Sequence, residues 1–452
     1  MSKKNGLEAA MVPGKSEPTE STPLVPRVGS EDGAGGGSGK GDNGGLSVNQ
    51  TAFLVAGEMV GSGVLALPRA LVKTGWVGVP ILVLTCLVAA FSGKRLGDCW
   101  TIIEGRDPDM RTRKRNPYAI IAEQSLGKFW SVAVSLAMMV TQFGVAVVYL
   151  LLAAQIIEQV FMTLAPTVTI CIWYLVVVGA MTPLMLFGTP RDFSFLGVIA
   201  FFAAVVACIL YFIQMMNDVR PFVFRWGIHG FTDFFLAMGI IMFAFGGAST
   251  FPTIQNDMTD KTKFNKSLQY GFTAMLALYL PIATAGYAVY GESVGSNFIT
   301  SLGPSALSLV GNVLMAVHLI CAFIILINPV CQELEELYSI PTDSVGYRAL
   351  ARVSIMAGIL FIGESIPRFY TILALVGGST IAFLTFVLPS YCYLNIISQP
   401  PREGQQTPEV ASWVKYACWQ IVVGAAVVGV AATYSAISAI FSTAMTTPCY
   451  LK

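Results

Sequence analysis

The run AGEMVGSGVLALP, from Ala56 to Pro68, is the most informative stretch of this chain. It lies within an apolar segment of the length that crosses a bilayer, about 20 residues, yet Gly61, Ser62 and Gly63 cluster at its centre. Glycine weakens a helix through its backbone entropy, and unwound backbone in lipid leaves polar groups unpaired. Such a break survives only where it is buried in protein or lines a cavity. The run therefore predicts an interrupted membrane helix at an interior position.

A second run, FAFGGASTFPTIQNDM from Phe243 to Met258, repeats this pattern with Gly246, Gly247 and Ser249. A single glycine pair in a membrane helix more often serves close helix packing. Here each break heads five apolar spans, and paired interrupted helices in corresponding halves are typical of inverted-repeat transporters. Unwound N–H groups and positive half-helix ends would then hold the carboxylate of a substrate.

The composition is that of an integral membrane protein. Hydrophobic residues make up 55% of the chain and charged residues 12%, against about 25% charged residues in soluble domains. A net charge of +1 gives no indication of a nucleic-acid partner. The nine cysteines form no CxxC pair, so the sequence predicts neither a metal site nor a disulfide framework. Two distant histidines and no HExxH argue against a membrane enzyme, and no cofactor is expected.

Eleven segments are long and apolar enough to be candidate membrane helices. They are residues 51–70, 76–96, 128–161, 168–187, 193–215, 234–251, 267–290, 306–331, 349–363, 369–397 and 414–442.

The domain organisation and orientation follow from composition and charge. Residues 1–49 are rich in Gly, Ser, Pro and charge and are expected to form a disordered tail. If that tail is cytoplasmic, the large majority of the 27 Lys and Arg residues fall on the cytoplasmic side, as the positive-inside rule requires. Residues 50–445 then form the transmembrane transporter domain, and residues 446–452 form a short extracellular or lumenal tail.

Three segments of the chain resemble a known family. GEMVGSGVLALPRA (57–70), FAFGGASTFPTIQNDM (243–258) and INPVCQELEE (327–336) are similar to signature segments of the amino acid/auxin permease family. The resemblance implies an all-α leucine-transporter-like fold: a 5+5 inverted repeat with broken first and sixth spans, plus one additional helix. It also implies amino acids as the substrate class. Family members often carry a histidine where this chain has Ala248, which weakens any mechanism that relies on that histidine.

Two ionisable residues within the spans are candidates for coupling. An intramembrane carboxylate is costly and points to function, and Glu58 lies one helical turn before Gly61. We expect Glu58 to bind the substrate ammonium, to take up and release a proton, or to do both. His318 is the only histidine in a span and could carry a proton. In each case the alternative is a structural residue bonded within the bundle.

The coupling ion is expected to be H⁺ rather than Na⁺. Sodium requires oxygen ligands, and residues 309–329 of the eighth span contain no Ser or Thr. Sodium coupling remains the alternative, as does an amino-acid-sensing receptor that uses the transporter fold.

The remaining candidates for the substrate site are aromatic or hydroxyl side chains. By resemblance, Tyr149 of the third span could close over the substrate carboxylate. Phe243 and Phe245 flank the second break, and Ser249 offers a hydroxyl. Plain packing is the alternative for each aromatic ring. Residues 20–25 loosely match an acidic dileucine-type sorting signal, which leaves the plasma membrane and endosomal, lysosomal or vesicular membranes open.

Overall fold

The computed structural model describes residues 45–107, 116–162, 164–186, 194–218, 227, 230–341, 344–400, 410–442 and 448–451. The predicted tail up to residue 44 lies outside these ranges. Residues 45–49, which fall within the predicted tail, are ordered. The Leu46 N–H donates to the Asp257 carbonyl at 2.8 Å, and the Thr259 N–H donates to the Leu46 carbonyl at 3.1 Å. Ser47 then caps the first helix in a capping box with Gln50.

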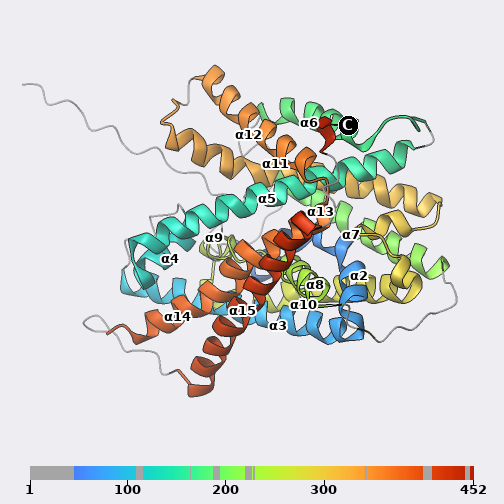
Figure 1. Cartoon of the computed structure of the whole chain (residues 1–452). Helices are drawn as coiled ribbons and strands as arrows, with labels where there is room; N and C mark the ends of the chain where they lie inside the picture. Colours follow the sequence, from blue (N-terminus) through green and yellow to red (C-terminus); the bar gives the residue numbers. More distant parts are fainter. Residues whose placement is uncertain are drawn as a thin grey trace, which may run out of the picture.

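Every predicted span contains helix (Figure 1), although α3 runs ten residues and α11 six residues past the predicted ends at residues 96 and 331. The first seven helices are α1 (Val48–Met59), α2 (Gly63–Thr74), α3 (Gly78–Arg106), α4 (Pro117–Leu126), α5 (Lys128–Phe161), α6 (Ile170–Leu186) and α7 (Ser194–Asn217). The rest are α8 (Phe231–Ala244), α9 (Phe251–Asn256), α10 (Phe264–Tyr290), α11 (Ala306–Leu337), α12 (Val345–Ser365), α13 (Phe369–Val376), α14 (Leu388–Ser398) and α15 (Ser412–Ser442). A π-helical stretch, η6 (Gly377–Val387), joins α13 to α14.

By length and composition, eight helices among the described residues could cross a membrane, and two shorter apolar helices accompany them. The break divides the first predicted span into α1 and α2, so neither half reaches the required length alone. The count of eleven spans therefore stays a prediction. The outward faces of α5 and α15 carry exposed large apolar side chains such as Phe129 and Val430. A hydrocarbon environment, rather than water, suits these faces.

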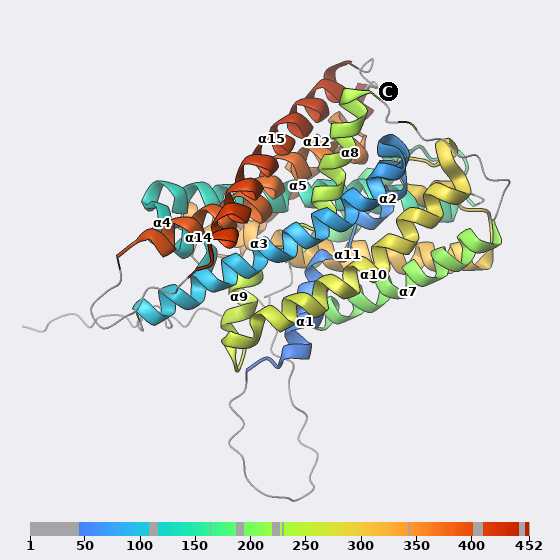
Figure 2. The same ribbon diagram turned by 90° about the horizontal axis from the view of Figure 1, so that it is seen from below.

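The two halves of each broken helix pack within the bundle. Helix α1 packs mainly on α10, and α2 packs on α8 and α10. Helix α11 lies against α7 and α5, and Figure 2 shows α10 and α7 side by side. Helix α15 packs against α8 and η6. The continuous helix α10 therefore packs on both halves of the first broken helix, which positions the candidate site.

A disulfide between Cys171 and Cys449 corrects the expectation that the cysteines form none. Cys171 is the second residue of α6, and Cys449 lies in the C-terminal turn η7 (Cys449–Leu451). The two cysteines are 278 residues apart in the sequence, so spacing alone could not pair them. Next to Cys449, the Tyr450 ring stacks on Phe361 of α12 at 5.9 Å. The C-terminal turn is thus fastened to α6 and packed on α12.

Candidate functional site

The first break is confirmed at the predicted position. Helix α1 ends at Met59, and α2 begins at Gly63 with Ser62 as its N-cap. Within the described residues, the N–H groups of Gly61, Ser62 and Gly63 donate to no backbone carbonyl. The Ser62 hydroxyl is also buried and has no partner among them. These unpaired groups lie inside the protein, where a polar ligand could satisfy them.

The second break is also confirmed, between Ala244 at the end of α8 and Phe251 at the start of α9. The N–H groups of residues 247–249 make no backbone hydrogen bond in the described part of the chain. Gly246, Gly247 and Ser249 are all partly accessible.

Glycine allows the two breaks to touch. A methyl group built on Gly63 would lie 2.9 Å from the Ala244 Cα, and one built on Gly247 would lie 3.1 Å from the Met59 side chain. The first of these distances is too short for any Cβ, because the neighbouring atom belongs to the backbone. The glycines thus bring the start of α2 against the end of α8 and form one site from two breaks.

Two predicted side chains from distant helices converge on Gly61. A Cβ built there would lie 2.7 Å from the Tyr149 hydroxyl of α5 and 3.6 Å from His318 Nε2 of α11. The Tyr149 and His318 rings lie 6.4 Å apart, centroid to centroid. His318 Nδ1 is 2.8 Å from the Ala200 carbonyl. Since a carbonyl only accepts hydrogen bonds, this contact places the proton of a neutral imidazole on Nδ1.

The Nε2 atom of His318 therefore carries a free lone pair on the side facing the break. It is buried and has no partner among the described residues. Buried polar atoms are normally paired. An unpaired acceptor beside Gly61 marks a position where a proton or a substrate donor could bind.

Glu58 lies in the last turn of α1. Its side chain is accessible, whereas Met59 and Val60 beside it are buried. No hydrogen bond or ion pair involves its carboxylate in the described part of the chain, although Tyr149 lies within its electrostatic range. The structural alternative requires the Glu58 carboxylate to be paired within the bundle, and no described residue pairs with it.

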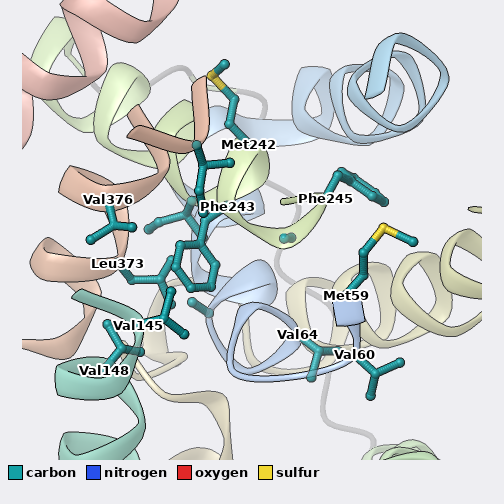
Figure 3. Packing of buried hydrophobic residues seen from close by; sticks show 14 of the residues in the cluster. Met59, Val60, Val64, Val145, Val148, Met242, Phe243, Phe245, Leu373 and Val376 are labelled. Carbon is teal, nitrogen blue, oxygen red and sulfur yellow. The ribbon is translucent and has the colours of Figure 1, made fainter. Parts of the chain in front are cut away.

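The surroundings of the breaks are apolar. Figure 3 shows Phe243 directed toward Val145 of α5 and Leu373 of α13, and Phe245 pointing elsewhere. Phe245 is fully buried, with its ring 5.9 Å from that of Tyr279. The two phenylalanines therefore have different environments, and only Phe243 faces α5 and α13.

Tyr279 of α10 was not predicted from the sequence, although it contacts the first break directly. Its hydroxyl donates to the Met59 carbonyl at 2.6 Å. A lone tyrosine in an apolar span gives no sequence signal, and only the fold brings it to Met59.

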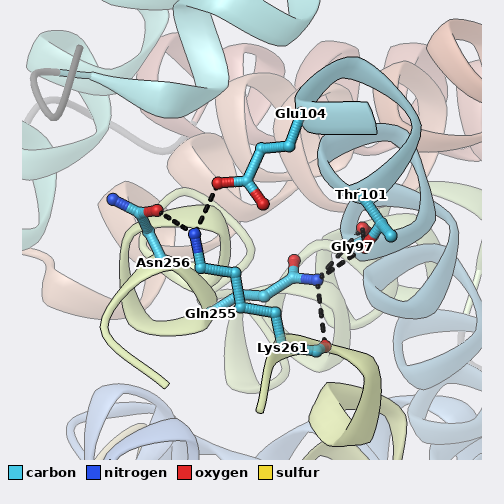
Figure 4. A network of polar contacts seen from close by, with 6 residues as sticks. All are labelled: Gly97, Thr101, Glu104, Gln255, Asn256 and Lys261. Atoms are coloured by element: carbon cyan, nitrogen blue, oxygen red, sulfur yellow. Dashed lines mark hydrogen bonds and ion pairs between the residues drawn. The ribbon is translucent and has the colours of Figure 1, made fainter. Parts of the chain in front are cut away.

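A polar network joins the C-terminal end of α9 to α3 (Figure 4). The Gln255 amide donates to the Gly97 carbonyl and to the Thr101 hydroxyl, at 3.2 Å each. Lys261 Nζ contacts both Glu104 at 2.5 Å and the Asn256 side chain at 2.6 Å. These bonds hold α9, the second half of the second broken helix, against α3.

The opposite ends of the half-helices are joined as well. Lys73 in the last turn of α2 forms an ion pair with Asp233 in the first turn of α8, at 2.8 Å. Arg69 donates to the carbonyls of Glu292 and Val294, at 3.0 and 3.1 Å. Polar contacts therefore link the half-helices to their neighbours on both sides of the site.

Two interrupted helices that meet inside a helical bundle are the defining feature of the leucine-transporter-like fold. Solved structures agree on the fold. A manganese transporter from Eremococcus coleocola superposes with a TM-score of 0.54 at 12% identity, over 88% of each chain. MhsT in complex with L-phenylalanine gives a TM-score of 0.52 at 12% identity, over 85% of this chain and 98% of its own.

Within that fold class, the chain belongs to the family described as transmembrane amino acid transporter protein, whose pattern matches residues 44–435. Amino acid transporter AVT1D of Arabidopsis thaliana is 25% identical over 406 residues, which cover 87% of this chain and 70% of that protein. Amino acid transporter AVT3C of the same plant is 24% identical, over 85% of this chain and 89% of its own. The protein is therefore a multi-pass membrane transporter of the amino acid transporter family, and not an enzyme.

Proposed function

We propose that this protein moves amino acids across its membrane by alternating access, driven by a proton gradient. The observation that carries the proposal is the convergence of Tyr149 and His318 on Gly61, at the point where the first helix is unwound.

The unwound backbone supplies the binding groups for the substrate. The free N–H groups of residues 61–63 lie at the N-terminal end of α2, where the helix dipole favours a carboxylate. The Tyr149 hydroxyl lies over the same residues and can donate to that carboxylate. Glu58, one turn earlier on α1, is the group for the substrate ammonium.

Proton coupling uses the same site. Glu58 has no competing partner among the described residues, and His318 presents a free Nε2 lone pair toward Gly61. Either group can hold a proton while the substrate is bound and release it on the other side. Sodium coupling is disfavoured because α11 directs an imidazole toward the site, while its residues 309–329 offer no hydroxyl ligand.

The orientation is part of the proposal. Residues 1–49 would be a cytoplasmic tail, 50–445 the transporter domain, and 446–452 an extracellular or lumenal tail. The Cys171–Cys449 disulfide supports this arrangement, since it requires both cysteines on one side and is typical of oxidising compartments.

The test is flux in proteoliposomes with a panel of labelled amino acids, under an imposed gradient of either protons or sodium. We expect saturable uptake of at least one amino acid that follows the pH gradient and ignores sodium. Uptake that follows sodium and ignores pH would refute the coupling. No flux of any amino acid, even with residues 1–44 deleted, would favour a receptor.

The variant Glu58→Gln separates binding from coupling. The neutral amide cannot exchange a proton, so accumulation against a gradient should be lost. Glu333→Gln, which lies in α11 beyond the apolar part of the helix, is the matched control and should leave transport unchanged. Normal accumulation by Glu58→Gln with unchanged pH dependence would remove Glu58 from the mechanism.

A further inference from the structure

Tyr279 contacts the backbone on both sides of Val60. The side chain is fully buried in α10, and its hydroxyl donates to the Met59 carbonyl at 2.6 Å. The Gly61 N–H lies near the Tyr279 hydroxyl as well. One hydroxyl thus binds the last carbonyl of α1 and lies beside the first N–H of the break.

This contact replaces a bond that a continuous helix would make. In an α-helix each carbonyl accepts from the N–H four residues later, so the natural partner of the Met59 carbonyl is the Gly63 N–H. The Tyr279 hydroxyl occupies that acceptor. The Gly63 N–H, left without a backbone acceptor, is one of the groups facing the site.

The same tyrosine also contacts the second break. Its ring lies 5.9 Å from that of Phe245, the first residue after α8. Tyr279 therefore holds residues from both interrupted helices, from a helix that is itself continuous.

We propose that Tyr279 is a positioning residue for transport: its hydroxyl caps α1 and keeps residues 60–62 unwound in the geometry that receives the substrate carboxylate. The inference rests on the binding site proposed above. Without the hydroxyl, the buried Met59 carbonyl lacks a partner, which is costly. The segment then relaxes toward helical bonding or admits water, and the free N–H groups lose their fixed directions.

The test compares Tyr279→Phe with Tyr118→Phe. Tyr118 is a matched control, because it is also fully buried and donates to a main-chain carbonyl, that of Leu384 at 2.5 Å. Both variants lose one buried hydrogen bond and keep the ring. The readouts are the KM and maximal rate of amino acid uptake, and deuterium exchange of the amides of residues 60–63 in the purified protein.

We expect Tyr279→Phe to raise KM about tenfold, equivalent to about 1.4 kcal/mol, with the maximal rate changed less than about twofold. The amides of residues 60–63 should exchange faster, since the segment loses the hydrogen bond that fixes the Met59 carbonyl. Tyr118→Phe should leave both KM and exchange at residues 60–63 as in the wild type.

Unchanged KM and unchanged exchange in Tyr279→Phe would overturn the inference. An equal rise of KM in Tyr118→Phe would also overturn it, because the effect would then be a general loss of stability. If the wild type shows no saturable uptake, the proposed function fails. The deuterium exchange of residues 60–63 then still decides whether Tyr279 stabilises the unwound segment.

Discussion

The Cys171–Cys449 disulfide offers a quantitative test of the structure. It closes a loop that spans most of the transporter, with a sequence separation of 278 between the two cysteines. Reduction or a Cys449→Ser substitution opens this loop. The substitution touches neither interrupted helix, so its main effect should fall on stability rather than on substrate binding.

The chain-entropy relation for a loop of this length gives about 5.6 kcal/mol of stabilisation. That value is an upper bound, because an unfolded membrane protein in detergent keeps helical structure and loses less freedom on cross-linking. Typical disulfides contribute about 2–4 kcal/mol. The unfolding entropy is about 2.1 cal/mol/K per residue. For a chain of 452 residues, a loss of about 2 to 5.6 kcal/mol in stability therefore corresponds to a fall of roughly 2–6 °C in Tm.

The assay is thermal unfolding of the detergent-purified protein with and without a reductant. Wild type in reductant should unfold at the temperature of Cys449→Ser, and the variant should not respond to reductant. The double variant with Cys171→Ser should match either single variant, since each single change already breaks the bond. Two single effects that add in the double variant would show that the bond does not form.

Two further variants test the contacts around the site. Gly63→Ala places a methyl group 2.9 Å from the backbone of α8, so we expect a loss of about 1–3 kcal/mol in stability together with loss of uptake. The control is Gly179→Ala in α6, where nothing lies within 4 Å. Equal behaviour of the two variants would contradict the close approach of α2 and α8. Lys261→Met leaves the buried Glu104 carboxylate without its ion-pair partner and should lower the unfolding free energy by about 3 kcal/mol. Lys263→Met removes a more exposed pair and should cost no more than about 1 kcal/mol, and chemical denaturation measures both.

Local sequence was enough to predict the architecture. Apolar runs of bilayer length predicted where the helices lie, and the clusters at Gly61–Gly63 and Gly246–Gly247 predicted both breaks. These features depend only on residues close together in the sequence, through the cost of unpaired polar backbone in hydrocarbon and the weak helix propensity of glycine. They need no knowledge of which helices are neighbours. Leu46, which local sequence assigned to the tail, is hydrogen-bonded to residues after α9, a contact that only the fold creates.

The tertiary structure alone decided which side chains meet. Tyr149 and His318 were named from their residue types, but their convergence on Gly61 depends on how α5 and α11 pack against the first break. Tyr279 and the Cys171–Cys449 bond gave no sequence signal, since each joins positions more than 200 residues apart. A hydrogen bond or a disulfide forms only where folding brings two atoms within bonding distance, and a single sequence contains no measure of that distance.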